Sequence, residues 1–438
     1  MSSRRWLLSC LAIAAGGLVL RLVYVLGFEN HAPLVGDASY YHYAANLLAD
    51  GKGFVQPLLY LEFRRAPVQA ADHPPAYIVT LAIASRAGLR TVLDHRIVSC
   101  LLGTATIVVV GMTGRRIAGE RAGLIAAAIA AVYPNLWLSD GLVMSETLTA
   151  LAAAVTVLAA YRFLHEPSMG RAAVLGVAVG VFALARSEAI LALPLLVLPA
   201  AFLAARRAPR RQIAYAALAI GAAFVVLAPW VGYNLTRFDH PEFVTTSLGW
   251  TLLNANCRPA YHGDRLGYWD YLCGGAVPGR ELHGDQSGND RVFRRTAQHY
   301  ISGHWVDVPR VVAARIGRTF AFYRPRQQIN FDMLEDGRPY GAAAAGIVMY
   351  YALLPFAVAG AVILRRRRVS ILPPLALVSM VVVTVAVTFG QTRYRATAEV
   401  GLVLLAAVAI DAAVSARARV RPNVHCVSSP SAGRLVAP

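Results

Sequence analysis

One carboxylate, Asp37, stands where a reaction centre could be built. It lies in the tyrosine-rich run 35–54, which follows the first apolar segment of the chain directly. Apolar residues recur at helical spacing between Tyr40 and Leu48, so the sequence predicts a short helix that Asp37 could cap. A carboxylate beside a membrane helix is costly unless it is used, and it could also take a proton from a hydroxyl group. A capping role and a catalytic role both stay open.

Other ionisable residues occupy three further turns between apolar segments. Asp140 and Glu146 flank the turn that follows Tyr133-Pro134, Arg186 ends a later segment, and Arg393 and Arg395 precede the last one. Carboxylates and guanidinium groups on one face are suited to deprotonating a hydroxyl beside a bound phosphate. Simpler interpretations exist for each: Asp140 as a solvated loop residue, Glu146 as an acid at a helix start, and the arginines as side chains reaching toward water.

Several polar residues have both a structural and a binding interpretation. His73 precedes two prolines, so it could hydrogen-bond that turn or contact a phosphate. Tyr40 and Tyr41 could belong to an interfacial aromatic belt or offer a platform for a sugar. Arg21, inside the first apolar segment, is expected to pair within a helix bundle. No Cys/His cluster has metal-ligand spacing, so no cofactor is expected, and a divalent cation at Asp37 stays open.

The composition shows what must position these residues. Of the 438 residues, 57% are hydrophobic and 15% are charged, whereas soluble domains carry about 25% charged residues. Apolar runs near 20 residues long recur along the chain, and about 20 helical residues span a bilayer. We therefore predict an all-α polytopic membrane protein. The net charge of +18 comes mostly from arginines in short loops, which indicates membrane topology and not nucleic-acid binding.

The arginines also set the expected topology. If the short segment 76–87 lies at the membrane interface, the arginine clusters at 115–121, 206–211, 365–368 and 417–421 all face the cytosol, as the positive-inside rule favours. Both termini then lie in the cytosol of a plasma (inner) membrane protein, and Asp37, Glu146, Arg186 and Arg393 share the outer face. This scheme predicts ten spanning helices, at about 6–28, 95–114, 121–138, 146–164, 171–186, 188–205, 212–231, 342–364, 370–389 and 397–416.

The long polar section is predicted to lie outside. Residues 242–247 could form a strand, 289–301 an amphipathic helix, and 307–322 a second such helix on the membrane surface, with its arginines off the apolar face. Cys257 and Cys273 share this section, so they form a disulfide there or stay as two free thiols. The residues from about 421 onward are expected to be disordered.

An ordered series of motifs accompanies these features. It consists of Gly36-Asp37 with tyrosines, His73-Pro74-Pro75-Ala76-Tyr77, Tyr133-Pro134 followed by Ser145-Glu146, Ala185-Arg186-Ser187-Glu188, Trp230 to Asn234, Asn254 with Asn256, and Arg393-Tyr394-Arg395. The series resembles the GT-C membrane glycosyltransferases, and within them the branch of the protein O-mannosyltransferases and the lipid A aminoarabinose transferase. The resemblance is good over residues 1–235 and loose beyond.

The resemblance implies transfer of a hexose or pentose from a polyprenyl-phosphate donor to an acceptor hydroxyl outside the cytosol, in the cell envelope. Asp37 matches the catalytic acid of the first outer loop, which acts as base in an inverting attack, and Glu146 matches a second acidic position. His73 stands where relatives often carry Lys near the donor phosphate, and Arg186, Arg393 and Arg395 would bind substrate. Many relatives have Asp-Glu where this chain has Asp37-Ala38, so Asp37 would act without that neighbour.

The expected organisation has four parts. Residues 1–231 form a transmembrane module with a catalytic outer loop at 29–75, 232–341 an extracytoplasmic section, 342–416 further transmembrane helices, and 417–438 a cytoplasmic tail. The sugar and the acceptor stay open. A transporter or flippase and a non-catalytic scaffold are the alternatives. Transporters tend to place ionisable groups near the midplane, whereas this chain has them at outer helix ends.

Overall fold

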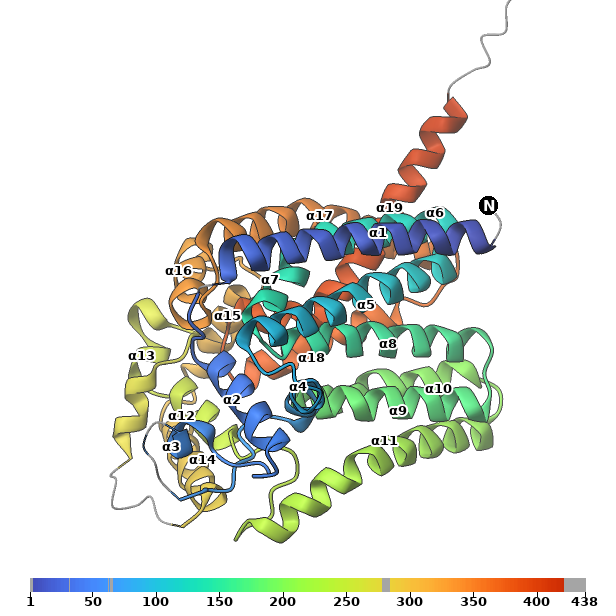
Figure 1. The fold of residues 1–438 in the computed structure, drawn as a ribbon. Coiled ribbons are helices and arrows are strands. Elements are labelled where there is room, and N and C mark those ends of the chain that lie inside the picture. The colour runs from blue at the N-terminus through green and yellow to red at the C-terminus, as the bar shows by residue number, and fades with distance from the viewer. Residues whose placement is uncertain (1–2, 31, 62, 64–65, 278–283, 421–438) are drawn as a thin grey trace, which may run out of the picture.

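Long apolar helices lie side by side in this molecule, and shorter helices gather at one end of them (Figure 1). The computed structural model describes the chain except residues 1–2, 31, 62, 64–65, 278–283 and 421–438, so the tail expected to be disordered lies outside the described residues. In the part of the chain that is described, the structure contains helices, turns and one isolated β-bridge, Val55–Gln69, but no strand.

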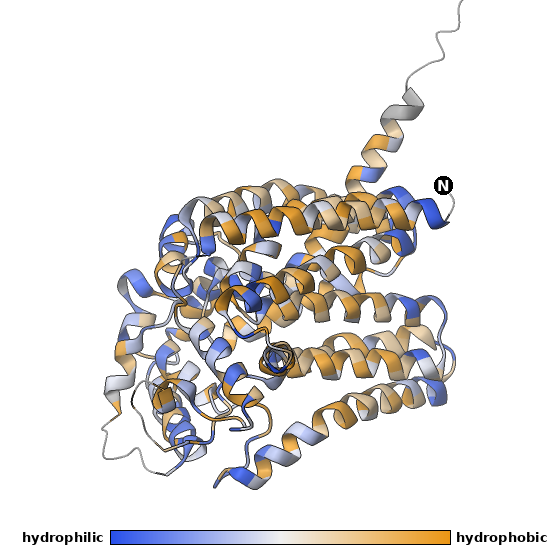
Figure 2. Cartoon of the chain, viewed as in Figure 1, coloured by the Kyte–Doolittle hydropathy of each residue, from blue (hydrophilic) through white to orange (hydrophobic). Residues whose placement is uncertain are grey.

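Among the described residues, seven helices are long and apolar enough to cross a bilayer. Hydrophobic residues dominate their middles and hydrophilic ones their ends (Figure 2). The chain is therefore a multi-pass helical membrane protein. The seven are α1 (Ser3–Tyr24) continued by η1 (Val25–Glu29), α5 (Val92–Ala118), α8 (Glu146–His165), η2 (Ser187–Leu191) with η3 (Leu193–Val197) and α10 (Leu198–Ala204), α11 (Pro209–Arg237), α17 (Tyr340–Arg366), and η7 (Thr392–Arg395) with α19 (Ala396–Val420).

Three more apolar segments are helical, but one of them is bent and the other two are shorter than the seven spans. The helices α6 (Glu120–Val132) and α7 (Pro134–Leu142) meet at a bend of 45°, so together they count as an eighth span at most. Pro134 causes the break, because proline lacks the N–H that would continue the helix. The helices α9 (Met169–Ala185) and α18 (Leu372–Val387) are 17 and 16 residues long. All ten predicted segments are thus helical, but the count of ten spans is not confirmed.

The shorter helices form the end of the molecule that carries the predicted site. The helix predicted at 76–87 is present as α4 (Pro75–Arg86) and has 12 residues, too few to span. Pro75 starts it because proline is favoured in a first helical turn. The others are α2 (Asp37–Ala49), α3 (Pro57–Leu61), α12 (Leu248–Ala255), α13 (Arg258–Tyr261), η4 (Gly263–Arg265), η5 (Tyr271–Ala276), α14 (Gln286–Gly303), α15 (Val308–Thr319) and α16 (Pro325–Asp336).

The bundle contains a buried ion pair between α1 and α7. Arg21 Nε donates to Asp140 Oδ2 at 2.6 Å, and each side chain is 1% exposed. The prediction that Arg21 pairs within the bundle is confirmed, whereas the interpretation of Asp140 as a solvated loop residue is wrong. The chain continues as helix α7 where a loop was expected, which turns Asp140 into the bundle beside Gly103 of α5. A side chain at Gly103 would collide with the carboxylate, so glycine makes the room for this pair.

Two predictions for the polar section are wrong. Residues 242–247 form no strand, because their backbone groups bond elsewhere: Trp230 Nε1 donates to Val244 O at 2.8 Å, and Thr246 N donates to Ala71 O at 2.9 Å. The helix expected on the membrane surface, α15, instead buries two of its arginines. Arg315 is 3% exposed and Arg318 is 0% exposed, because their guanidinium groups donate to backbone carbonyls of neighbouring segments. The helix predicted at 289–301 is present as α14.

Cys257 and Cys273 are joined by a disulfide within this section, with their Cα atoms 6.0 Å apart. The bond links the start of α13 to η5 and closes a loop of the polar section. Disulfides persist only in oxidising compartments, so its presence agrees with an extracytoplasmic position.

Thiol labelling should test this bond directly. In denatured protein that has not been reduced, we expect a maleimide reagent to label neither Cys257 nor Cys273, and to label both after reduction. Cys10 and Cys100 are free and buried, so they should react on denaturation alone and serve as internal controls. Equal labelling of Cys257 with and without reductant would contradict the bond.

Candidate active site

Asp37 is the first residue of α2 and does not cap it. The N-cap position is Gly36, whose φ of +55° favours glycine, and no side chain caps the helix. The carboxylate of Asp37 contacts two other side chains instead. Arg393 Nη1 donates to Asp37 Oδ2 at 2.8 Å, and His73 Nε2 lies 3.6 Å from Asp37 Oδ1. The predicted capping role is therefore wrong. The carboxylate makes a charge-assisted hydrogen bond with Arg393 in place of a bond to the free N–H groups of the helix.

Arg393 joins Asp37 to a second carboxylate. Its Nη1 also lies 3.4 Å from Asp336 Oδ1, at the end of α16. Asp336 accepts a hydrogen bond from Gln391 Nε2 at 2.9 Å and lies 3.7 Å from Arg338 Nε. Burial raises the pKa of Asp336 to about 7 against the opposing effect of Arg393. The guanidinium of Arg393 thus lies between one exposed carboxylate and one buried carboxylate.

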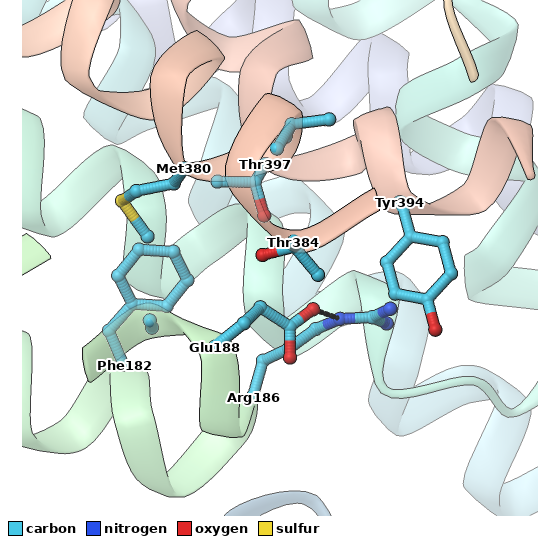
Figure 3. A pocket seen from close by; sticks show the side chains of 9 residues that line it. Phe182, Arg186, Glu188, Met380, Thr384, Tyr394 and Thr397 are labelled. Carbon is cyan, nitrogen blue, oxygen red and sulfur yellow. Dashed lines mark hydrogen bonds and ion pairs between the residues drawn. The ribbon is translucent and has the colours of Figure 1, made fainter. Parts of the chain in front are cut away.

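A second arginine repeats this arrangement next to the first. Arg186, at the end of α9, donates to Glu146 Oε1 at 2.8 Å and to Glu188 Oε1 at 2.5 Å. Its guanidinium carbon lies 4.8 Å from the ring centre of Tyr394, which follows Arg393 in η7 (Figure 3). Residues from α2, from the start of α8, from the ends of α9 and α16, and from the turn η7 therefore form one connected polar cluster.

Asp37 is the most exposed of the carboxylates described in this cluster. Its side chain is 34% exposed, compared with 24% for Glu188, 2% for Glu146 and 4% for Asp336. Burial raises the pKa of Asp37, but Arg393 and His73 more than offset it, so the pKa lies below its ordinary value. Asp37 is therefore ionised at neutral pH and open to an incoming hydroxyl group, whereas the buried carboxylates are held by arginines.

His73 is fixed by two tyrosine rings. The ring centres of Tyr40 and Tyr41 each lie 4.8 Å from that of His73. Tyr40 is 6% exposed and Tyr41 is 3% exposed, so neither belongs to an aromatic belt and neither offers a face to a sugar. These two expectations are wrong because α2 packs against α4 and turns both rings inward. Their place in the structure is to orient His73 toward Asp37.

Arg395 does not join the cluster. Its Nε donates to Glu399 Oε1 at 2.5 Å, and its guanidinium carbon lies 3.8 Å from the ring centre of Tyr350. The side chain is 2% exposed and points into the bundle between α17 and α19. Arg395 lies two residues after Arg393 in the turn η7, and its side chain contacts Glu399 where that of Arg393 contacts Asp37. The expectation that both arginines bind substrate therefore does not fit this geometry.

Two carboxylates near Asp37 escaped the sequence analysis. Asp336 lies in the polar section, where no residue type stood out. Asp72 accepts hydrogen bonds from Gln56 Nε2 at 3.0 Å and Gln286 Nε2 at 3.1 Å, and burial raises its pKa. The signals were weak but present: Asp72 directly precedes His73, and Asp336 ends an acidic stretch just before an apolar helix on the same predicted face.

A small pocket opens beside the cluster, between the end of α9, the second half of α18 and the start of α19 (Figure 3). One side of it is polar and the other is apolar. Arg186, Glu188 and Tyr394 lie on the polar side, and the cavity has a volume of about 10 Å³. Among the described residues, no three His, Cys, Asp or Glu side chains are placed to hold a metal ion. The pocket is lined by Phe182, Arg186, Glu188, Ala189, Met380, Val381, Thr384, Tyr394 and Thr397.

Comparison with known proteins agrees with the fold. Residues 72–233 match the family model of dolichyl-phosphate-mannose-protein mannosyltransferases. The structure of the archaeal oligosaccharyltransferase AglB from Archaeoglobus fulgidus, in complex with an inhibitory peptide and a dolichol-phosphate, superposes with a TM-score of 0.54 at 12% identity, over 98% of this chain and 53% of that one. The chain has a GT-C fold. No curated protein sequence matches it significantly.

Two further structures are similar to this chain to different degrees. The Archaeoglobus fulgidus oligosaccharyltransferase tethered to an acceptor peptide superposes with a TM-score of 0.56 at 13% identity, over 96% of this chain and 51% of that one. ArnT from Cupriavidus metallidurans bound to undecaprenyl phosphate has a TM-score of 0.46 at 16% identity, over 94% of this chain and 79% of that one. The chain spans about half the length of the archaeal oligosaccharyltransferases that it matches.

Proposed function

We propose that this GT-C protein transfers a sugar from a polyprenyl-phosphate carrier to an acceptor hydroxyl group, with Asp37 as the base. The observation that carries the proposal is the accessible, ionised carboxylate of Asp37 held between Arg393 and His73. The family model that matches residues 72–233 is that of dolichyl-phosphate-mannose-protein mannosyltransferases. The structure of the archaeal oligosaccharyltransferase contains a dolichol-phosphate. Arg186 lines a small pocket next to apolar side chains, where a donor phosphate would compete with Glu188 for the guanidinium.

The reaction follows from the position of the charges. Asp37 accepts the proton of the acceptor hydroxyl as its oxygen attacks the anomeric carbon. The bond between that carbon and the phosphate oxygen breaks, and polyprenyl phosphate leaves from the opposite face, so the configuration inverts. Arg393, Arg186 and His73 are placed beside Asp37 to stabilise the negative charge that develops on the leaving phosphate.

Donor binding would also activate the base. In the structure Arg393 is bonded to Asp37, which keeps the pKa of that carboxyl low and its basicity weak. A donor phosphate that takes up part of the guanidinium would weaken this bond, and the pKa of Asp37 would rise. Glu146 has a supporting role in this scheme, because its buried carboxylate fixes Arg186.

A donor panel tests the proposal. Membranes that contain the protein are offered radiolabelled polyprenyl-phosphate hexoses and pentoses, and membranes without it serve as the blank. We expect protein-dependent release of polyprenyl phosphate and label in an acceptor with one sugar class. Loss of the carrier from one leaflet without cleavage of the sugar–phosphate bond would favour a flippase. No protein-dependent cleavage with any donor would overturn the proposal.

The proposed orientation places the Asp37 cluster outside the cytosol and both termini inside. Residues 365–368, four consecutive arginines at the end of α17 and in the turn after it, should then lie in the cytosol. A reporter active only in the cytosol, inserted after Arg367, should give a signal. The same reporter inserted at Gly275, in the polar section 232–341, should give none. The reverse pattern would contradict the orientation and the division of the chain into outer and inner parts.

A further inference from the structure

A second recess lies at the end of the molecule opposite Asp37. It is formed by the start of α1, the end of α5 and the end of α8, and Trp6, Met112 and Leu158 give it an apolar lining. Because α5 has 27 residues and rises about 1.5 Å per residue, the recess lies about 40 Å from the Asp37 end. It is therefore separate from the proposed donor site.

The rim of this recess is strongly basic. Arg4, Arg115, Arg116 and Arg162 line it together with His165, and no lining residue is acidic. Two nearby carboxylates neutralise only part of this charge. Glu120 pairs with Arg115 at 2.9 Å, and Glu166 lies 3.8 Å from Arg116 but is shared with Arg171.

Arg162 is a cation of this rim without a counter-charge. It projects from the last turn of α8, it is exposed, and among the described residues it makes no ion pair. Arg115 is in turn held in place by Trp6, with its guanidinium carbon 4.5 Å from the ring centre. The recess thus combines one fixed guanidinium with a free one, an arrangement that suits an anion with several oxygen atoms.

An apolar path leads away from the recess along the membrane face of α1. Leu7 lines the recess itself and is 45% exposed, and Leu8 and Leu11 further along the helix are 57% and 45% exposed. A ligand that has its anionic group at the arginines could therefore lay a hydrocarbon chain on these leucines.

We propose that this recess binds the phosphate headgroup of an anionic membrane phospholipid, with its acyl chains along α1. Basic pockets between transmembrane helices on the cytoplasmic side are suited to such headgroups, and each arginine near the surface contributes a similar share of the affinity. The site does not depend on the function proposed for the Asp37 cluster.

Lipid binding to the purified full-length protein tests the proposal. Native mass spectrometry in detergent measures the occupancy by phosphatidylglycerol, with phosphatidylcholine as the neutral lipid and glycerol phosphate as the free anion. We expect retention of phosphatidylglycerol over phosphatidylcholine and no retention of glycerol phosphate. The double variant R116Q/R162Q should lose about fivefold in affinity for each charge removed, roughly twenty-fivefold in all.

The matched control is R210Q/R211Q, which removes two exposed arginines from the same predicted face outside the recess. It should keep wild-type affinity for phosphatidylglycerol. Equal binding by wild type and R116Q/R162Q, or an equal loss in R210Q/R211Q, would overturn the proposal, and so would retention of glycerol phosphate as strong as that of the lipid. Unchanged melting in phosphatidylcholine would show that the variants are folded.

Discussion

Replacement of Asp37 by asparagine should reduce sugar transfer by about a hundredfold or more while the protein accumulates normally. A positioned general base contributes about 10²–10⁴ to a reaction rate. Asparagine has the shape of aspartate and can still accept a hydrogen bond from Arg393, so the local structure should persist while the ability to take a proton is lost. The measurement is the initial rate of polyprenyl-phosphate release in membranes, normalised to the amount of protein.

The matched control lies at the other end of the same helix, α2. Asp50 follows α2, is 45% exposed and pairs with Arg90, so D50N removes an equivalent charge away from the cluster. Exposed ion pairs contribute about 1 kcal/mol at most, so D50N should transfer sugar at the wild-type rate. If D37N also retained the wild-type rate, Asp37 could not be the base, and the buried carboxylates of the cluster would have to be reconsidered.

The sequence was sufficient for the parts of the fold that obey local rules. Apolar runs of bilayer length located the helices, and arginine positions assigned their ends to two sides. That reasoning grouped Asp37, Glu146, Arg186 and Arg393 before any contact was known. The grouping succeeded because helices in a membrane are nearly parallel. Charged residues in every second connection between helices therefore lie at the same end of the bundle.

These local patterns could not predict contacts between residues that are far apart in the sequence. Asp37 and Arg393 are 356 residues apart, and neither hydropathy nor helical spacing relates them. Asp336 belongs to the cluster because the end of α16 lies beside Gln391 and Arg393. Arg395 was grouped with Arg393 because the two are neighbours in sequence, whereas the turn η7 directs them to different partners. Which face a side chain takes in a tight turn depends on tertiary packing.

The second large effect is expected at the ion pair between Arg21 and Asp140. D140N keeps the size of the side chain but leaves the charge of Arg21 without a partner at 1% exposure. Breaking a buried ion pair from one side typically costs about 3–5 kcal/mol, so D140N should melt well below wild type in detergent. R21M should have a similar effect, because it leaves a buried carboxylate uncompensated.

The double variant R21M/D140N distinguishes a lost ion pair from general damage to the bundle. Once both charges are gone, neither is buried without a partner, so the double variant should be far more stable than the sum of the single losses predicts. The exposed pair of Arg90 and Asp50 supplies the comparison, since removing it should cost about 1 kcal/mol or less. Wild-type melting of D140N would mean that Asp140 is solvated, as the sequence alone suggested. Additive losses would mean that Arg21 and Asp140 stabilise the bundle separately, and the close approach of α5 at Gly103 would need another explanation.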